Sequence, residues 1–288
     1  MSIPSVSFEF FPPQSLAGSF RLWDTVQSLA PLSPRFVSVT YGAGGTTREL
    51  TREAVVTLQE NSQLRVAAHL TCVNASRSET LDIAKSFAAA GVSDIVALRG
   101  DPPRGTGPFR AHPDGFSNSC ELIAALRDSG DFVIRVGAYP DGHPEATDLQ
   151  SDIEWLKRKA DAGASEALTQ FFFDSDPYFR FRDACQKAGV EIPIIPGILP
   201  IENWQGTVRF AQRCGAKIPD WLSSAFEKAM RDNRADLLAT AVCTELCSDL
   251  IAGGVDTLHF YTLNRPELTR DVCFALGLVP RIKLKNVA

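Results

Sequence analysis

Short apolar runs alternate with longer amphipathic stretches from one end of the chain to the other. The short runs are rich in β-branched and aromatic residues and predict strands, whereas the amphipathic stretches predict helices. The predicted strands cover residues 5–11, 36–41, 66–72, 94–99, 133–139, 167–173, 194–198 and 257–262. The predicted helices cover residues 19–30, 47–61, 78–90, 118–128, 148–162, 177–188, 204–213, 221–252 and 266–276.

This alternation predicts βα units and a parallel sheet. Eight units favour an α/β fold of the (β/α)8 or TIM-barrel type over an open sheet, with extra helices before the last strand. The stretch richest in Pro and Gly, 101–115, follows the fourth strand and predicts a long βα loop at the active face. No linker divides the chain, so we expect residues 1–288 to form a single barrel domain.

Composition narrows the class of protein. The 288 residues, 44% of them apolar, suffice for one large core. The formal charge of −5 is spread without a basic tract, which argues against nucleic acid or an anionic membrane as a partner. We see no secretion signal and no apolar run of membrane-spanning length. The seven scattered cysteines indicate reduced thiols, so we expect a cytoplasmic protein.

A metal site is not expected. Cys243 and Cys247 lie four residues apart on a predicted helix, but no second Cys or His cluster completes a ligand set. Two buried helix cysteines are the simpler interpretation.

The first strand places a carboxylate inside the predicted barrel. Its period of two directs Val6, Phe8 and Phe10 towards the helices, and Ser7 and Glu9 into the barrel. A buried carboxylate is costly unless it is paired or used. Glu9 therefore has one of two roles. It is hydrogen-bonded to a neighbouring group for structural reasons, or it is a general acid with a pKa that is raised by burial.

Other strand ends also carry polar groups, where a barrel of this kind builds its active site. The glycine-rich segment 40–47 either binds a phosphate at the start of a helix or is a tight turn without a ligand. It lacks the G-x-G-x-x-G fingerprint of dinucleotide-binding proteins. His69 is a satisfied core residue or a ligand contact. Arg99 and Asp101 either form a simple ion pair or belong to the active site. In the second case, Arg99 would bind an anionic cofactor and Asp101 would be a carboxylate of the site. Gln170 satisfies backbone groups or binds a ligand.

The fifth strand leads into a polar loop and a helix with two adjacent cations. Tyr139 and His143 lie in the loop, and Arg158 and Lys159 lie three and four residues after Trp155, near one helix face. A solvated face is the alternative. Taken together, the residues at the strand ends predict a barrel enzyme that binds an extended ligand with anionic and aromatic parts. They do not identify that ligand.

At these strand ends the sequence resembles the methylenetetrahydrofolate reductase family. The matching stretches occur in order over nearly the whole chain: SFEFFPP (7–13), FVSVTYGAGG (36–45), AHLTC (68–72), DIVALRGDPP (94–103), AYPDGHPEA (138–146), LKRKADAGA (156–164), TQFFFD (169–174), IIPGILP (194–200) and HFYTLNR (259–265). The resemblance covers a catalytic domain, and we expect no regulatory domain.

The resemblance implies a flavin-dependent barrel that reduces 5,10-methylenetetrahydrofolate to 5-methyltetrahydrofolate. Hydride would pass from NADH or NADPH through bound FAD to the folate in a ping-pong sequence, feeding methyl groups to methionine synthesis and one-carbon metabolism. We expect a homo-oligomer.

The same resemblance assigns roles to residues. Glu9 corresponds to the general acid, and Asp101 to a carboxylate that tunes the flavin and contacts the pterin. The implied substrate-binding positions are Glu9, Asp101, Gln170, Phe210, Tyr261 and Arg265. The implied FAD-binding positions are Thr40, Tyr41, Ala43, His69, Arg99, Gly100, Asp101, Tyr139, His143, Ala146, Asp152, Arg158 and Lys159.

The loop 104–117 and Trp155 depart from the family's pattern. Two other functions stay open. A pterin-binding methyltransferase barrel would lack flavin and be colourless, and a non-catalytic folate- or flavin-binding protein would not need the internal carboxylates Glu9 and Asp101.

Overall fold

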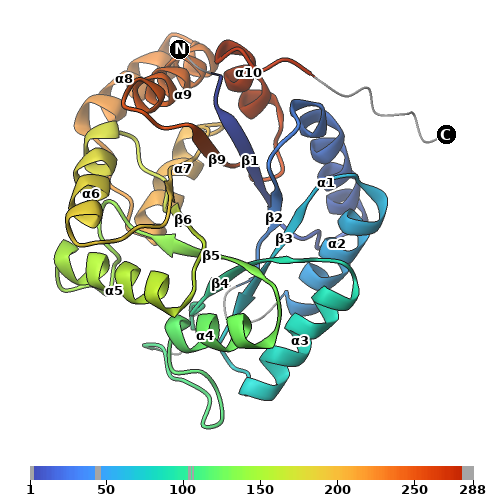
Figure 1. Cartoon of the computed structure of the whole chain (residues 1–288). Helices are drawn as coiled ribbons and strands as arrows, with labels where there is room; N and C mark the ends of the chain where they lie inside the picture. The colour runs from blue at the N-terminus through green and yellow to red at the C-terminus, as the bar shows by residue number, and fades with distance from the viewer. Residues whose placement is uncertain (1–2, 43–46, 103–104, 106, 281–288) are drawn as a thin grey trace.

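Eight βα units close into a barrel, as the alternation of strands and helices predicts. The computed structural model describes residues 3–42, 47–102, 105 and 107–280. Within these residues, parallel strands surround a central axis and helices cover them from outside (Figure 1). The strands are β1 (Ser5–Phe10), β2 (Val37–Val39), β3 (Val66–Thr71), β4 (Asp94–Leu98), β5 (Val133–Ala138), β6 (Glu166–Thr169), β7 (Ile194–Ile195), β8 (Gly197–Ile198) and β9 (Thr257–Tyr261).

Side-chain caps define where several helices begin. Ser76 and Glu79 form a reciprocal capping box at the start of α3, and Asp148 accepts a hydrogen bond from the Ser151 N–H at the start of α5. The helices are α1 (Leu16–Leu29), α2 (Arg48–Asn61), α3 (Arg77–Ala89), α4 (Ser119–Ser129), α5 (Leu149–Ala162), α6 (Ser175–Lys187), α7 (Trp204–Cys214), α8 (Asp220–Arg231), α9 (Ala235–Ala252) and α10 (Glu267–Ala275), with a short 3-10 turn η1 (Ala30–Leu32).

The seventh predicted strand is interrupted at Pro196. Its first part, β7, pairs with β6, and its second part, β8, pairs with β9. Proline has no N–H to donate to a ladder, but its carbonyl oxygen accepts a hydrogen bond from the His259 N–H at 3.0 Å. The interrupted strand therefore serves a different neighbour on each side and completes the barrel.

The two faces of β1 separate core from barrel interior as its alternation predicts. Val6, Phe8 and Phe10 belong to the apolar cluster that includes Leu22 and Val26 of α1. The residues between them, at positions 7 and 9, contact side chains of other strands inside the barrel.

The predicted extra helices lie between β8 and β9: α7, α8 and α9 fill this insertion, and Figure 1 shows α8 and α9 stacked outside β9. Cys243 and Cys247 lie on α9 and both are buried. No group of His, Cys, Asp or Glu in the described part of the chain is arranged to hold a metal ion. None of the helices in these same residues is long and apolar enough to span a membrane.

Candidate active site

Two adjoining cavities open at the carboxyl ends of the strands. The inner cavity, of about 190 Å³, contains Glu9, and the outer cavity, of about 650 Å³, extends over the ends of β4 and β5 to α5. Leu98, Gly137, Tyr139 and Gln170 line both. Because these walls are shared, one extended ligand in the outer cavity can reach a second ligand in the inner one.

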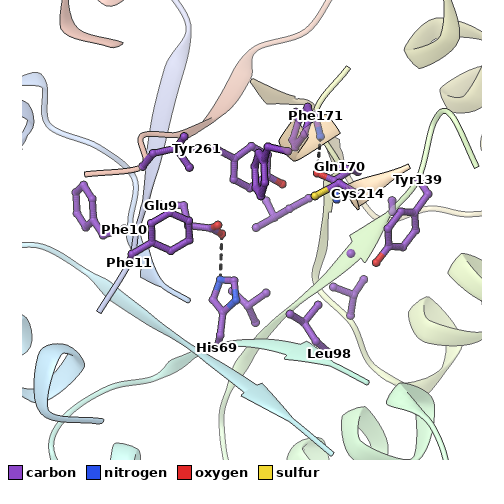
Figure 2. Close-up of a pocket in the computed structure, with 17 residues that line it drawn as sticks. Glu9, Phe10, Phe11, His69, Leu98, Tyr139, Gln170, Phe171, Cys214 and Tyr261 are labelled. Carbon is purple, nitrogen blue, oxygen red and sulfur yellow. Dashed lines mark hydrogen bonds and ion pairs between the residues drawn. The ribbon is translucent and has the colours of Figure 1, made fainter. Parts of the chain in front are cut away.

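Glu9 lies among two imidazoles and a hydroxyl. Its Oε2 atom is 3.1 Å from Nε2 of His69, 3.7 Å from Nε2 of His259 and 3.5 Å from Oγ of Ser38, which donates to it. Figure 2 shows Glu9 and His69 pointing towards each other at one side of the cavity. All three groups face the same oxygen atom of the carboxylate.

The expectation that burial raises the pKa of Glu9 is wrong in its net direction. Burial does raise the pKa of this carboxyl, but the charge interaction with His69 and hydrogen bonding by His259 and His69 outweigh it and lower the pKa to about 2. Glu9 is therefore a carboxylate at neutral pH in the ligand-free protein. The sequence places Glu9 in the barrel but does not say which side chains of other strands face it.

Aromatic rings form the opposite wall of the inner cavity. Phe210 of α7 stacks on Phe171 with ring centroids 5.3 Å apart and planes 21° apart, and Tyr261 meets Phe171 edge-on at 6.2 Å. The Tyr261 hydroxyl donates to the Thr169 carbonyl oxygen at 2.6 Å, which fixes the ring. Such a wall suits a flat heteroaromatic ring.

Gln170 lies where the two cavities meet. Its side-chain oxygen accepts a hydrogen bond from the Phe171 N–H at 3.1 Å. The amide nitrogen on the same side chain is thereby oriented as a donor to either cavity.

Two cations line the outer cavity. Arg99 forms a two-point ion pair with Glu145, with distances of 2.5 and 3.0 Å, and not with Asp101, which is exposed on the same rim. Hydrogen bonding to Glu145 raises the pKa of Arg99, and burial lowers the pKa of Lys159 to about 8. An anionic ligand here would meet two positive charges and would compete with Glu145 for one of them.

Backbone geometry shapes the floor of the outer cavity. Gly100 has φ +85°, and a Cβ there would lie 2.8 Å from the Thr71 Cβ, so only glycine fits without a shift. Asp152 of α5 accepts a hydrogen bond from the His143 N–H at 2.8 Å, which ties the loop after β5 to that helix. Burial, followed by the charge of Arg99, lowers the pKa of His143.

Most positions singled out from the sequence come together in these cavities. The inner cavity is lined by Glu9, His69, Tyr139, Gln170, Phe210 and Tyr261. The outer cavity is lined by Tyr41, Arg99, Gly100, Asp101, Tyr139, His143, Ala146, Asp152, Lys159 and Gln170.

Three singled-out positions, Thr40, Arg158 and Arg265, do not line either cavity. Thr40 precedes Tyr41, and its backbone N–H pairs with the Phe10 carbonyl oxygen. Arg158 is exposed, with its guanidinium 5.1 Å from the centre of the Trp155 ring. Arg265 is exposed after β9. Ala43 falls outside the described residues.

Some lining residues were not found by sequence reasoning. Glu145 pairs with Arg99 across 46 positions, and Phe109 of the loop after β4 lies under the same guanidinium at 4.8 Å. Phe171 and Cys214 also line the inner cavity. Glu145 lies within the stretch 138–146 that carries the family resemblance, and its charge was the only available signal.

Comparison with known proteins identifies the family. The sequence model described as "Methylenetetrahydrofolate reductase" matches residues 2–277. The chain belongs to the methylenetetrahydrofolate reductase family. It is 43% identical to the 5,10-methylenetetrahydrofolate reductase of Salmonella typhimurium over 279 residues, covering 96% of this chain and 92% of that protein. It is 42% identical to the Escherichia coli enzyme of the same name over 277 residues, with the same coverage. The prediction of a methylenetetrahydrofolate reductase enzyme is thereby confirmed.

Other relatives define the extent of the match. The Arabidopsis thaliana protein named "Methylenetetrahydrofolate reductase (NADH) 1" is 36% identical over 293 residues, which cover 97% of this chain and 49% of that protein. Among solved structures, a Clostridium thermocellum protein described as binding two copies of 5-methyl-5,6,7,8-tetrahydrofolic acid aligns with a TM-score of 0.61 at 12% identity, covering 96% of this chain and 94% of that one. At this identity, the alignment supports the barrel fold alone.

Proposed function

We propose that residues 1–288 act as one cytoplasmic catalytic domain that reduces 5,10-methylenetetrahydrofolate to 5-methyltetrahydrofolate, with NADH as reductant and FAD as cofactor. The observation that carries this proposal is the pair of adjoining cavities. One holds a carboxylate facing an aromatic wall, and the other holds two cations within reach of an anionic cofactor. NADH is preferred to NADPH because the Arabidopsis relative is named for NADH.

The outer cavity has the donor set that FAD needs. Arg99 and Lys159 suit the diphosphate, and the close approach at Gly100 lets backbone lie against the cofactor. Tyr139 and Gln170, on the wall shared with the inner cavity, suit the ring end. When bound, FAD accepts a hydride from the nicotinamide and returns it to the folate.

Glu9 supplies the proton in this proposal. The folate's five-membered ring opens when its nitrogen is protonated, which produces a reactive iminium. The Glu9 carboxylate must first take up a proton, because its pKa is about 2 in the ligand-free protein. A pterin filling the cavity displaces water and so raises the carboxyl pKa towards the protonated form.

The small size of the inner cavity supports the proposal of ping-pong kinetics. The stacked pair of Phe171 and Phe210 offers a flat wall to one heteroaromatic ring at a time. Nicotinamide and folate would then occupy it in turn, which gives ping-pong behaviour. We also propose that the protein is a homo-oligomer.

A stepwise anaerobic experiment tests the proposal. The purified protein should be yellow, and NADH should bleach it faster than NADPH at equal concentration. Added 5,10-methylenetetrahydrofolate should restore the colour and yield 5-methyltetrahydrofolate. A colourless protein that does not reduce 5,10-methylenetetrahydrofolate would favour the flavin-free methyltransferase, and a yellow protein that neither substrate affects would favour a binding protein.

A further inference from the structure

A buried serine and histidine stand behind Glu9. Ser7 of β1 and His259 of β9 are paired in the strand register, and both are 0% exposed. The Ser7 hydroxyl lies 2.8 Å from Nδ1 of His259, and the Leu258 carbonyl oxygen lies 3.5 Å from the same hydroxyl. The hydroxyl can therefore donate either to the imidazole or to the carbonyl.

The imidazole is fixed between aromatic rings. His259 stacks on Phe36 with centroids 5.7 Å apart and planes 18° apart, and Tyr261 meets it edge-on at 5.2 Å. Its second nitrogen, Nε2, faces Glu9 and lies 3.7 Å from Oε2 of that carboxylate. Each ring nitrogen thus faces one defined group, Ser7 or Glu9.

We propose that His259, with its tautomer set by Ser7, is a positioning residue that supports both protonation states of Glu9. With Glu9 ionised, Ser7 donates to Nδ1, and the Nε2–H faces the carboxylate. With Glu9 protonated, the carboxyl O–H donates to Nε2, the Nδ1–H donates to Ser7, and Ser7 donates to the Leu258 carbonyl oxygen. The second arrangement holds one more proton than the first, and that proton is the one available to the substrate. His259 is neutral in both.

The surroundings of His259 favour the neutral ring. Burial lowers the pKa of His259, although the nearby Glu9 raises it, and the charges of His69 and Arg135 lower it further. The Arg135 guanidinium lies 3.7 Å from the centre of the Phe36 ring on which His259 stacks. The charged and titratable groups that face the imidazole are therefore Glu9 from β1, His69 from β3, Arg135 from β5 and Tyr261 from its own strand.

Nitrogen NMR of histidine-labelled protein tests the tautomer directly. The chain has 4 histidines, and His259→Gln identifies the signal of this one. We expect the wild-type protein at pH 7.5 to show a neutral His259 protonated at Nε2. In Ser7→Ala, Nδ1 loses its donor, and the signal should become a mixture of tautomers. A wild-type His259 that is an imidazolium, or is protonated at Nδ1, would overturn the proposal.

Kinetics test the consequence for Glu9, and this part rests on the proposed function. In Ser7→Ala, reoxidation of the reduced flavin by 5,10-methylenetetrahydrofolate should slow by about tenfold or more, with a shifted pH profile. Reduction by NADH should change less than about twofold. Thr257→Val is the matched control, because it removes a buried hydroxyl from β9, the strand of His259, at a position outside both cavities. It should leave both rates and the pH profile as in wild type.

The two experiments separate the possible failures. If the wild-type protein does not reduce the folate, the proposed function fails and NMR alone decides the role of Ser7. If wild type is active and Ser7→Ala keeps both its rate and its pH profile, His259 does not position Glu9. Equal slowing of both half-reactions in Ser7→Ala would show a general structural defect and would also contradict the proposal.

Discussion

Lys159 on α5 donates a hydrogen bond from its Nζ to the carbonyl oxygen of Gly137 on β5, at 2.8 Å. The ammonium is thereby held at the wall of the outer cavity, and its pKa of about 8 follows chiefly from burial. Arg158, the neighbouring cation, instead lies over Trp155 and is exposed. Two adjacent basic residues thus differ in environment, and we expect them to differ in function.

If Lys159 binds the FAD diphosphate as proposed, FAD affinity should fall as the pH rises above about 8, because the ammonium then loses its proton. Lys159→Met should weaken binding at pH 7 by roughly 10- to 100-fold, the range expected for loss of a charge-assisted hydrogen bond. This variant should also lose the fall in FAD affinity above pH 8. Titration of the apoprotein with FAD between pH 6.5 and 9.5 measures both. Arg158→Met is the matched control, and an equal loss in the two variants would contradict the assignment.

The same lysine links stability to pH. Its pKa is about 8 in the folded protein and near the ordinary 10.5 when unfolded, so the unfolded state binds more protons between these values. The contribution of Lys159 to the free energy of unfolding of the apoprotein should therefore increase as the pH rises from 8 to 10.5. Urea unfolding of wild type and Lys159→Met at several pH values isolates it. A constant difference between the two proteins would show that Lys159 keeps an ordinary pKa.

Glu9→Gln should separate the two half-reactions. The amide keeps the shape of the side chain but cannot give a proton, so folate reduction should fall by about 100-fold or more. Flavin reduction by NADH needs no such proton and should change little. Stopped-flow absorbance of each half-reaction provides the measurement. Similar losses in both would make Glu9 a structural residue.

The sequence was most informative where the chain's own periodicity decides the structure. Alternation along β1 correctly placed Glu9 inside the barrel, and repetition of strand and helix predicted the closed fold. The sequence predicted one continuous seventh strand over residues 194–198, and periodicity did not reveal that Pro196 divides it into two parts that pair with different neighbours.

Contacts between distant strands were the part that the sequence did not reveal. His69 and His259 meet at Glu9 although they are 190 positions apart, and their combined effect reverses the expected pKa shift. Arg99 similarly pairs with Glu145 instead of the nearby Asp101. Such electrostatic results depend on strand register and rotamers, which short motifs do not specify.

Gly100→Ala should distort the floor of the outer cavity. The new Cβ would meet Thr71 at 2.8 Å, and φ of +85° disfavours any L side chain, so we expect a loss of about 1–3 kcal/mol in unfolding free energy. Gly107→Ala is a matched control because its φ is +82° and no atom lies within 4 Å of the added carbon. Urea unfolding and FAD titration of both variants separate the steric clash from the backbone cost. Equal effects would show that the contact with Thr71 relaxes without cost.

A charged network closes the opposite end of the barrel. Arg135 of β5 bonds to Asp94 at the start of β4 and, at 2.9 Å, to Glu166 at the start of β6. Arg65 and Arg35 complete the network, with distances of 2.7 Å to Asp94 and 2.6 Å to Glu166. Asp94 is 0% exposed and Arg135 is 2% exposed, so the central pair is shielded from water.

Arg135→Met should therefore be strongly destabilising, because it leaves the buried Asp94 carboxylate with only Arg65 to balance it. We expect a loss of about 3–5 kcal/mol in unfolding free energy, measured by urea denaturation. Adding Asp94→Leu should recover part of that loss, since the double variant no longer contains the unbalanced charge. The exposed pair of Lys85 and Asp82 is the control, where Asp82→Ala should have little effect because water already solvates both groups. If the losses in the Arg135 and Asp94 variants simply add, the two residues do not stabilise each other, and the closed end of the barrel is held by its apolar contacts instead.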